Sequence, residues 1–242
     1  MPLPPAIGLQ WLRRGFADLR HSPAVSLAHG AVLLLAGLVI VWIGFAQATL
    51  LAGAFSGFVL VAPALLIGLY AQSRAIARGE PGGFQQVVSA WQRTRHSALR
   101  VGLLLALAGS AWVLVSSLIV AAADVDDGGV AGYLRFFAGR DHPLLFWIWL
   151  LAGGVGAALV FAATAISLPM LVDQDVSIMQ AVATSIAAVG NHPVAMAIWA
   201  GLIMLLTLIA MVSVIGLLVL VPVLGHASWH AYADLTSRRA AT

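Results

Sequence analysis

Four long stretches of this sequence contain no Asp, Glu, Lys or Arg. They run between Pro23 and Arg74, from Val101 to Ala123, from Pro143 to Val172 and from Val176 to Ala233. About 20 consecutive apolar residues are enough for a helix to cross the hydrocarbon core of a bilayer. The composition agrees, because 62% of the residues are hydrophobic and only 9% are charged. The stretches hold six such helices, so the sequence predicts an all-α membrane protein with six transmembrane helices.

The six expected spans form one membrane domain with short ends. The first uncharged stretch divides near Gln47, and an acidic turn at residues 124–129 ends the third span. Met1–Ile7 has no basic residue and the first apolar run is too long for a signal-peptide core, so we expect this span to be retained. The expected spans are 24–46, 50–72, 99–122, 143–172, 193–211 and 214–232, in a membrane domain 24–235 between an amphipathic helix, 1–23, and a tail, 236–242.

The distribution of arginine predicts the orientation. All 12 Lys and Arg positions are arginines, and with six spans only Arg135 and Arg140 fall on the side opposite the termini. Basic residues concentrate on the cytoplasmic side of membrane proteins, so we expect both termini to be cytoplasmic. The missing cysteine and lysine exclude disulfides, thiolate metal sites and Schiff-base chemistry. The net charge of +3 is spread over scattered arginines and does not form a nucleic-acid-binding patch.

The chain also shows a weak internal repeat. Amphipathic segments precede the odd-numbered spans, at 7–20, 84–100 and 176–189, and such helices commonly lie in the membrane interface. Gln10 precedes Pro23 by the same interval as Gln180 precedes Pro193. The pattern favours three repeated units, each an interfacial amphipathic helix followed by a transmembrane hairpin.

Four blocks of the sequence carry a family resemblance. They are Trp11–Leu19 with Pro23, Ala62-Pro63 with Gly68–Arg74, Ser167–Leu171 with Asp175-Val176, and Gly225–Tyr232. These blocks resemble a bacterial inner-membrane protein family of unknown function, some of whose members are labelled potential cytochrome c oxidase subunits. His29 departs from the pattern, which has Tyr before the glycine. The resemblance implies six spans, the bacterial inner membrane and no established activity, and it hints at a respiratory oxidase.

Histidines near the cytoplasmic ends of the spans are the candidate ligands. His226 and His230 share one helix face through their i, i+4 spacing, and Asp234 follows four residues later. His29 lies just inside the first span. Imidazole and carboxylate groups ligate divalent metals, and histidines bind haem in helical bundles. Histidine, tryptophan and tyrosine also occur at membrane interfaces without any ligand, so the expected cofactor is either none, a divalent metal or haem.

No expected span carries Asp, Glu, Lys or Arg, which argues against an ion-coupled carrier. The sequence favours a non-catalytic accessory or scaffold protein, linked through its resemblance to a respiratory oxidase. Two alternatives stay open: passive transport of a small solute or lipid, and a haem- or metal-binding role. Expected partners are the lipid bilayer and either a membrane protein or further copies of this chain, because small residues such as Gly53, Gly57 and Gly153 allow close helix packing. The hydroxyls available to a passive pathway are Ser56, Thr164, Ser167 and Thr207.

Overall fold

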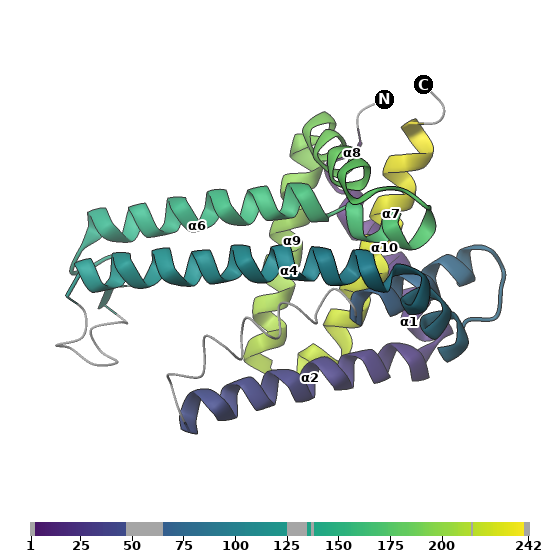
Figure 1. Ribbon diagram of the computed structural model, residues 1–242, viewed down its shortest axis with the longest axis horizontal. Coiled ribbons are helices and arrows are strands. Elements are labelled where there is room, and N and C mark those ends of the chain that lie inside the picture. The colour runs from purple at the N-terminus through teal and green to yellow at the C-terminus, as the bar shows by residue number, and fades with distance from the viewer. Residues whose placement is uncertain (1–2, 47–64, 125–134, 137, 214, 240–242) are drawn as a thin grey trace.

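The computed structural model describes residues 3–46, 65–124, 135–136, 138–213 and 215–239, and within them all regular secondary structure is helical (Figure 1). Residues 65–77 form one of these helices. The others are α1 (Ile7–His21), α2 (Pro23–Ala46), α4 (Phe84–Ala122), α6 (Pro143–Thr164), α7 (Ser167–Asp173), α8 (Ile178–Asn191), α9 (Pro193–Ser213) and α10 (Ile215–Arg239).

Three helical stretches of the described chain are long and apolar enough to cross a membrane. They are Phe84–Ala122, Pro143–Asp173 and Pro193–Ala210, and the bent pair of α1 and Pro23–Val39 would make a fourth. The expected span 50–72 and the Gly53–Gly57 motif lie largely or wholly outside the described residues. The count of six spans therefore stays a sequence-based prediction.

Prolines bend the chain at two equivalent places. Ser22, between α1 and α2, has φ −130° and ψ 64°, and His192, between α8 and α9, has φ −132° and ψ 52°. A residue before proline is disfavoured in the helical conformation, so α1 and α8 each end two residues before the proline that begins the next helix. The chain bends by 107° between α1 and α2.

The middle unit has no such bend. Residues 84–122 contain no proline, and α4 continues through all 39 of them. At about 1.5 Å per residue this helix is about 58 Å long, nearly twice a hydrocarbon core of about 30 Å. The expected interfacial helix at 84–100 is therefore not a separate element, and the repeat is clearest in the first and third units.

A serine from α8 supports the break between α6 and α7. Ser185 Oγ accepts a hydrogen bond from the Ile166 N–H at 3.1 Å and donates one to the Ala162 carbonyl at 2.6 Å. These bonds satisfy backbone groups that lose their helical partners where α6 ends. The expected span 143–172 thus consists of two helices, α6 and α7.

The main core lies where α1, α7, α9, α10 and helix 65–77 meet the first half of α4, which contributes Ala90, Ala98 and Val101. Trp11 of α1 and Trp199 of α9 are nearly completely buried, and their rings make an edge-to-face contact at 5.5 Å. On α1, Ile7, Trp11, Asp18 and Leu19 are buried, whereas Leu9 and Phe16 are 59% and 47% exposed. Part of the apolar surface of α1 is therefore not covered by the rest of the described chain.

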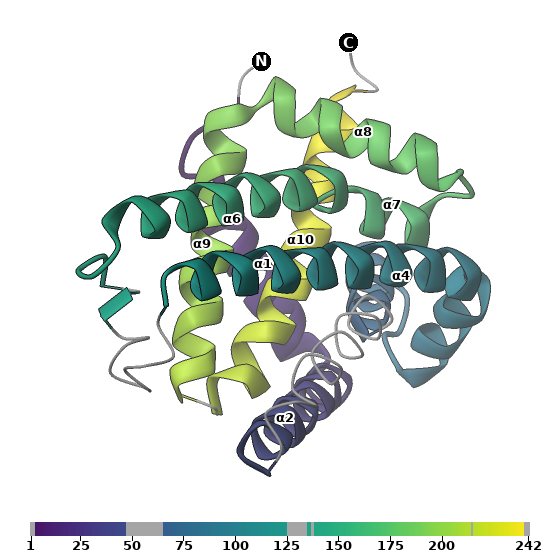
Figure 2. The same cartoon turned by 60° about the vertical axis from the view of Figure 1, so that its left-hand side comes forward.

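Helices α4 and α6 form a separate pair at the side of this core. They run side by side, and α9 and α10 cross their direction in both views (Figures 1 and 2). Trp149 donates a hydrogen bond to Ser116 Oγ at 2.7 Å, and its ring lies 5.8 Å from that of Trp112. None of the most apolar part of either helix is buried within the protein.

Candidate functional site

Two glycines allow α1 and α2 to approach the backbone of α10. A Cβ atom at Gly15 would lie 2.6 Å from the Val223 carbonyl oxygen, and one at Gly30 would lie 2.1 Å from the Leu218 carbonyl oxygen. Both distances are too short for a carbon atom beside backbone that cannot rotate away. This close approach places polar side chains of α1 and α2 directly beside those of α10.

These side chains form a cluster, here called the α1–α10 polar cluster. His226 is at its centre and is completely buried. Its Nδ1 lies 2.7 Å from Ser73 Oγ and its Nε2 lies 2.9 Å from Ser26 Oγ. The members of the cluster are Trp11, Arg14, Asp18, Ser26, Ser73, His226, His230 and Asp234.

The serine partners determine how His226 carries its protons. Ser73 Oγ donates to Asp18 Oδ2 at 2.6 Å, so its lone pair faces Nδ1 and that ring nitrogen is the donor. Ser26 Oγ lies within hydrogen-bond distance of both Nε2 and the Ser22 carbonyl. When the Ser26 hydroxyl points toward Nε2, it donates its proton to the neutral imidazole of His226. When it points toward the Ser22 carbonyl, its oxygen accepts a hydrogen bond from the Nε2–H of an imidazolium. Both protonation states of His226 are therefore satisfied by a single rotation of the Ser26 hydroxyl.

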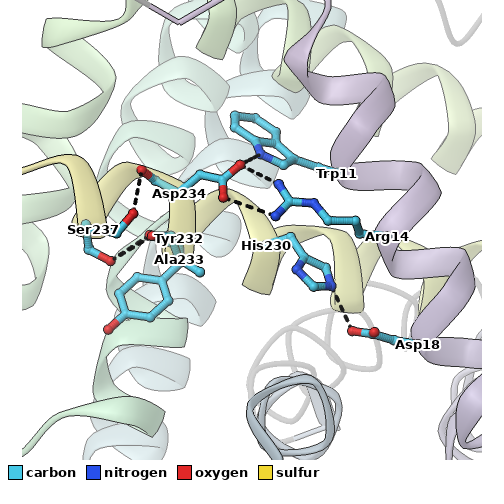
Figure 3. Close-up of polar contacts among 9 residues, drawn as sticks. Trp11, Arg14, Asp18, His230, Tyr232, Ala233, Asp234 and Ser237 are labelled. Carbon is cyan, nitrogen blue, oxygen red and sulfur yellow. Dashed lines mark hydrogen bonds and ion pairs between the residues drawn. The ribbon is translucent and has the colours of Figure 1, made fainter. Parts of the chain in front are cut away.

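Asp18 is the acidic residue of this buried region and is 6% exposed. Besides Ser73 it contacts His230, whose Nε2 lies 2.9 Å from Asp18 Oδ2 (Figure 3). The His226 ring is further away, with Nδ1 4.0 Å from the same oxygen. Asp18 thus connects α1 to helix 65–77 through Ser73 and to α10 through His230.

Asp234 makes a second connection between α1 and α10. Trp11 Nε1 donates to Asp234 Oδ2 at 2.9 Å, and Arg14 binds both carboxylate oxygens, with Nη1 3.1 Å from Oδ1 (Figure 3). Burial alone would raise the pKa of Asp234, but the hydrogen bonds from Arg14 and Trp11 and the arginine charge outweigh it and lower that pKa. The carboxylate is therefore held ionised.

A neighbouring group of side chains surrounds Asp173 at the end of α7. Arg74 Nε lies 2.8 Å and Arg78 Nη2 3.1 Å from Asp173 Oδ1, while Tyr232 donates to Oδ2 at 2.8 Å. Gln174 in turn donates to the Tyr232 hydroxyl at 3.0 Å. Asp173 therefore joins helix 65–77, α7 and α10.

A family described as "Predicted integral membrane protein (DUF2189)" matches residues 50–173, about half of the chain. The chain belongs to this family. The sequence-based expectation of a membrane protein family of unknown function is thereby confirmed. The match includes helix 65–77, all of α4, α6 and α7, and the residues Ser73, Arg74 and Asp173. No curated protein and no solved structure matches the chain.

In this DUF2189 protein the four predicted metal ligands have other partners. His226 and His230 contact Ser26, Ser73 and Asp18, and Asp234 binds Arg14 and Trp11. His29 Nδ1 lies 2.7 Å from the Val25 carbonyl, and its Nε2 lies against Gly68. In the part of the chain that the structure describes, no three His, Asp or Glu side chains are arranged to hold a metal ion. The metal site stays a sequence-based prediction, and the observed hydrogen bonds favour a structural role for these residues.

Sequence reasoning did not assign a role to Asp18, Ser26, Ser73 and Asp173. These residues come from different segments of the chain, and only folding brings them together. Asp18 and Ser73 do lie inside blocks that carry the family resemblance, Trp11–Leu19 and Gly68–Arg74. The position of these two residues inside those blocks was the available signal.

Proposed function

We propose that this protein is a non-catalytic accessory or scaffold protein of the membrane. The observation that carries the proposal is that its most reactive side chains are buried and bonded to one another. Ser26, Ser73 and His226 are each 0% exposed. A catalytic serine–histidine pair must reach the substrate carbonyl, and here no part of the pair is accessible. Asp18, moreover, reaches His226 through Ser73 and does not orient the ring directly.

The exposed surface of the α4–α6 pair supports the same proposal. Leucine side chains on both helices are more than half exposed, including Leu107, Leu118 and Leu159. Such a surface is stable in contact with lipid chains or with another membrane protein. The α1–α10 polar cluster would then be the rigid base that holds this apolar pair in the bilayer.

The proposed topology has six spans, both termini in the cytoplasm and a location in the bacterial inner membrane. The three long apolar stretches and the bent first pair supply up to four spans among the described residues. The remaining support is the arginine distribution of the sequence and the family resemblance. Cysteines introduced singly at the chain ends and in the Asp124 turn, labelled in intact cells, test this orientation.

Photo-crosslinking in native membranes tests the proposed function. A photoreactive residue replaces Leu107 or Leu159 on the α4–α6 pair, and Gly190 of α8, where an added Cβ would meet nothing within 4 Å, serves as the control site. We expect one reproducible adduct with an identified membrane protein that also captures this chain in the reciprocal experiment. Adducts with lipid alone would contradict the scaffold proposal and favour passive transport. Association with a respiratory oxidase is one outcome of this experiment and not its premise.

The two other functions have weaker support. For a passive pathway, Thr164 Oγ1 donates to the Val160 carbonyl of its own helix at 2.7 Å, so this hydroxyl can only accept a hydrogen bond from a solute. For a haem or metal protein, the histidine nitrogens would first have to leave Ser26, Ser73 and Asp18. An optical spectrum and a metal analysis of the purified protein test that role, and a stoichiometric metal or a Soret band would establish it.

A further inference from the structure

A cavity of about 550 Å³ lies between helix 65–77 and the first turns of α4. Three arginines line it, Arg74, Arg78 and Arg93, together with the uncharged donors Gln85, Gln86 and Ser89. Its volume is in the range of small-molecule sites in proteins. None of these residues belongs to the α1–α10 polar cluster, although Arg74 and Arg78 contact Asp173.

The charges around this cavity suit one anion. Three arginines face two carboxylates, Glu80 in the lining and Asp173 beside it, which leaves one net positive charge. Asp173 fixes Arg74 through Nε and Arg78 through Nη2, so both guanidinium groups keep other N–H donors for a ligand. Arg93 has no ion pair within the described part of the chain and adds a third set of donors.

The start of α4 adds a favourable dipole. Gly83 precedes the helix and has no side chain to cap it, so the first backbone N–H groups of a 39-residue helix are not satisfied by a cap side chain. Gln85 and Gln86 of this first turn line the cavity. Unpaired N–H groups at a helix start favour a negatively charged group.

We propose that this cavity binds a single phosphate group, and that the phosphate is presented by a phospholipid headgroup or by a soluble phosphate compound. Arginine forks and amide donors match the planar arrangement of phosphate oxygens. The cavity also lies where the expected second span ends and the amphipathic start of α4 begins. Basic pockets at this level of a membrane protein recognise anionic lipid headgroups.

Native mass spectrometry of the full-length protein, released from nanodiscs that contain equal amounts of phosphatidylglycerol and phosphatidylcholine, tests the proposal. We expect the wild-type protein to retain phosphatidylglycerol preferentially. Arg93→Gln should reduce that preference about tenfold, since a charge-assisted hydrogen bond of about 1.4 kcal/mol is lost. Arg95→Gln is the matched control, because Arg95 is exposed on the same helix and does not line the cavity. Glu80→Gln should change the preference in the opposite direction by removing the repelling carboxylate.

A second arm distinguishes the two sources of phosphate. The melting temperature of delipidated protein in detergent is measured in the presence of inorganic phosphate and, separately, of chloride at the same ionic strength. If the protein retains phosphatidylglycerol but phosphate does not raise its melting temperature, the cavity is a lipid site. If phosphate raises the melting temperature and Arg93→Gln abolishes that increase, the cavity is a site for soluble phosphate. The proposal is overturned if neither probe binds, or if Arg93→Gln and Arg95→Gln have equal effects. Melting temperatures of both variants verify that they fold.

Discussion

The α1–α10 polar cluster and the α4–α6 pair are held together in opposite ways. In the cluster, backbones touch at glycines, and buried polar groups form hydrogen bonds that join four segments of the chain. In the α4–α6 pair, apolar side chains face outward, and few contacts, such as Trp149 with Ser116, join the helices. The difference teaches that the buried polar groups of the cluster are held by specific partners, whereas apolar helices in a membrane need little specific contact.

The largest difference between the two regions is expected when one methyl group is added to a glycine in each of them. Gly30→Ala would place a carbon 2.1 Å from the Leu218 carbonyl oxygen, and neither backbone can move independently of its helix. We expect a loss of more than about 3 kcal/mol in the free energy of unfolding, or failure to fold.

The matched control is Gly156→Ala on α6, where the added carbon would meet nothing within 4 Å. We expect its stability to change by less than about 1 kcal/mol, with a small gain from the higher helix propensity of alanine. Unfolding in mixed micelles measures both variants. Equal losses would show that the two regions are packed alike.

Replacing the central histidine is expected to have the next largest effect. His226→Ala removes one hydrogen bond from each of the Ser26 and Ser73 hydroxyls and opens a buried cavity, while the bonds of these hydroxyls to the Ser22 carbonyl and to Asp18 remain. We expect a loss of about 2 to 3 kcal/mol in the free energy of unfolding, because each lost hydrogen bond costs about 1 kcal/mol and the cavity adds to that cost. His96→Ala, at an exposed position of α4, should cost less than about 0.5 kcal/mol. A similar loss for both histidines in the same unfolding assay would contradict a structural role that is specific to the cluster.

The Asp234 ion pair should make the cluster sensitive to acid. The pKa of Asp234 is lower in the folded protein than in the unfolded chain, so its stabilisation is present above the unfolded pKa of about 3.9 and is lost as the pH falls through the folded value. Asp234→Asn should therefore destabilise the protein at pH 7 and have no effect in strong acid. We expect no more than about 1 kcal/mol at pH 7, since the Arg14 side chain is 40% exposed and water screens the pair.

Asp141→Asn removes a second ion pair, outside the α1–α10 polar cluster, and serves as the comparison for Asp234→Asn. Asp141 pairs with Arg135 near the start of α6, and their side chains are 39% and 50% exposed. Because this pair is more exposed than the first, its loss should change stability by less than about 0.5 kcal/mol. Melting temperatures measured from neutral to acidic pH test both variants, and a gap between wild type and Asp234→Asn that does not close in acid would refute the assignment.

The last variant removes a proline bend, and its expected effect on stability is also small. Pro193→Ala permits His192 to become helical and gives the unfolded chain more freedom, so we expect a loss of under about 1 kcal/mol. The distribution of distances between spin labels on α8 and α9 should broaden toward the longer distances of a straight helix. The distances between two labels on α4 should not change and serve as the control. An unchanged distribution would show that the packing of α8 against α6 and α7 sets the bend without the proline.

The positions of the apolar helices could be predicted from the sequence, because charge-free length is a local property. Proline spacing likewise indicated that the first and third units are alike, and their bends agree closely in φ and ψ. The sequence did not predict that α4 would run straight from residue 84, because amphipathic and apolar segments joined without a proline do not specify where a bend occurs.

The partners of the histidines could not be predicted in the same way. The i, i+4 spacing placed His226, His230 and Asp234 on one helix face and suggested that they share a ligand. Their partners come from α1, α2 and helix 65–77, and the His230–Asp18 contact joins residues 212 positions apart. Spacing along one helix says nothing about which other helix packs against it.

The sequence by itself determined that this is a helical membrane protein, and it predicted apolar stretches that are helical in the described chain at 24–46, 99–122 and 193–211, since hydrophobic length is a local property. The tertiary structure alone decided that Gly15 and Gly30 lie against the backbone of α10 and that Asp18, Ser73 and His226 share one buried network. The physical reason is that a buried polar group is stable only beside its partner, and those partners meet only when distant segments pack.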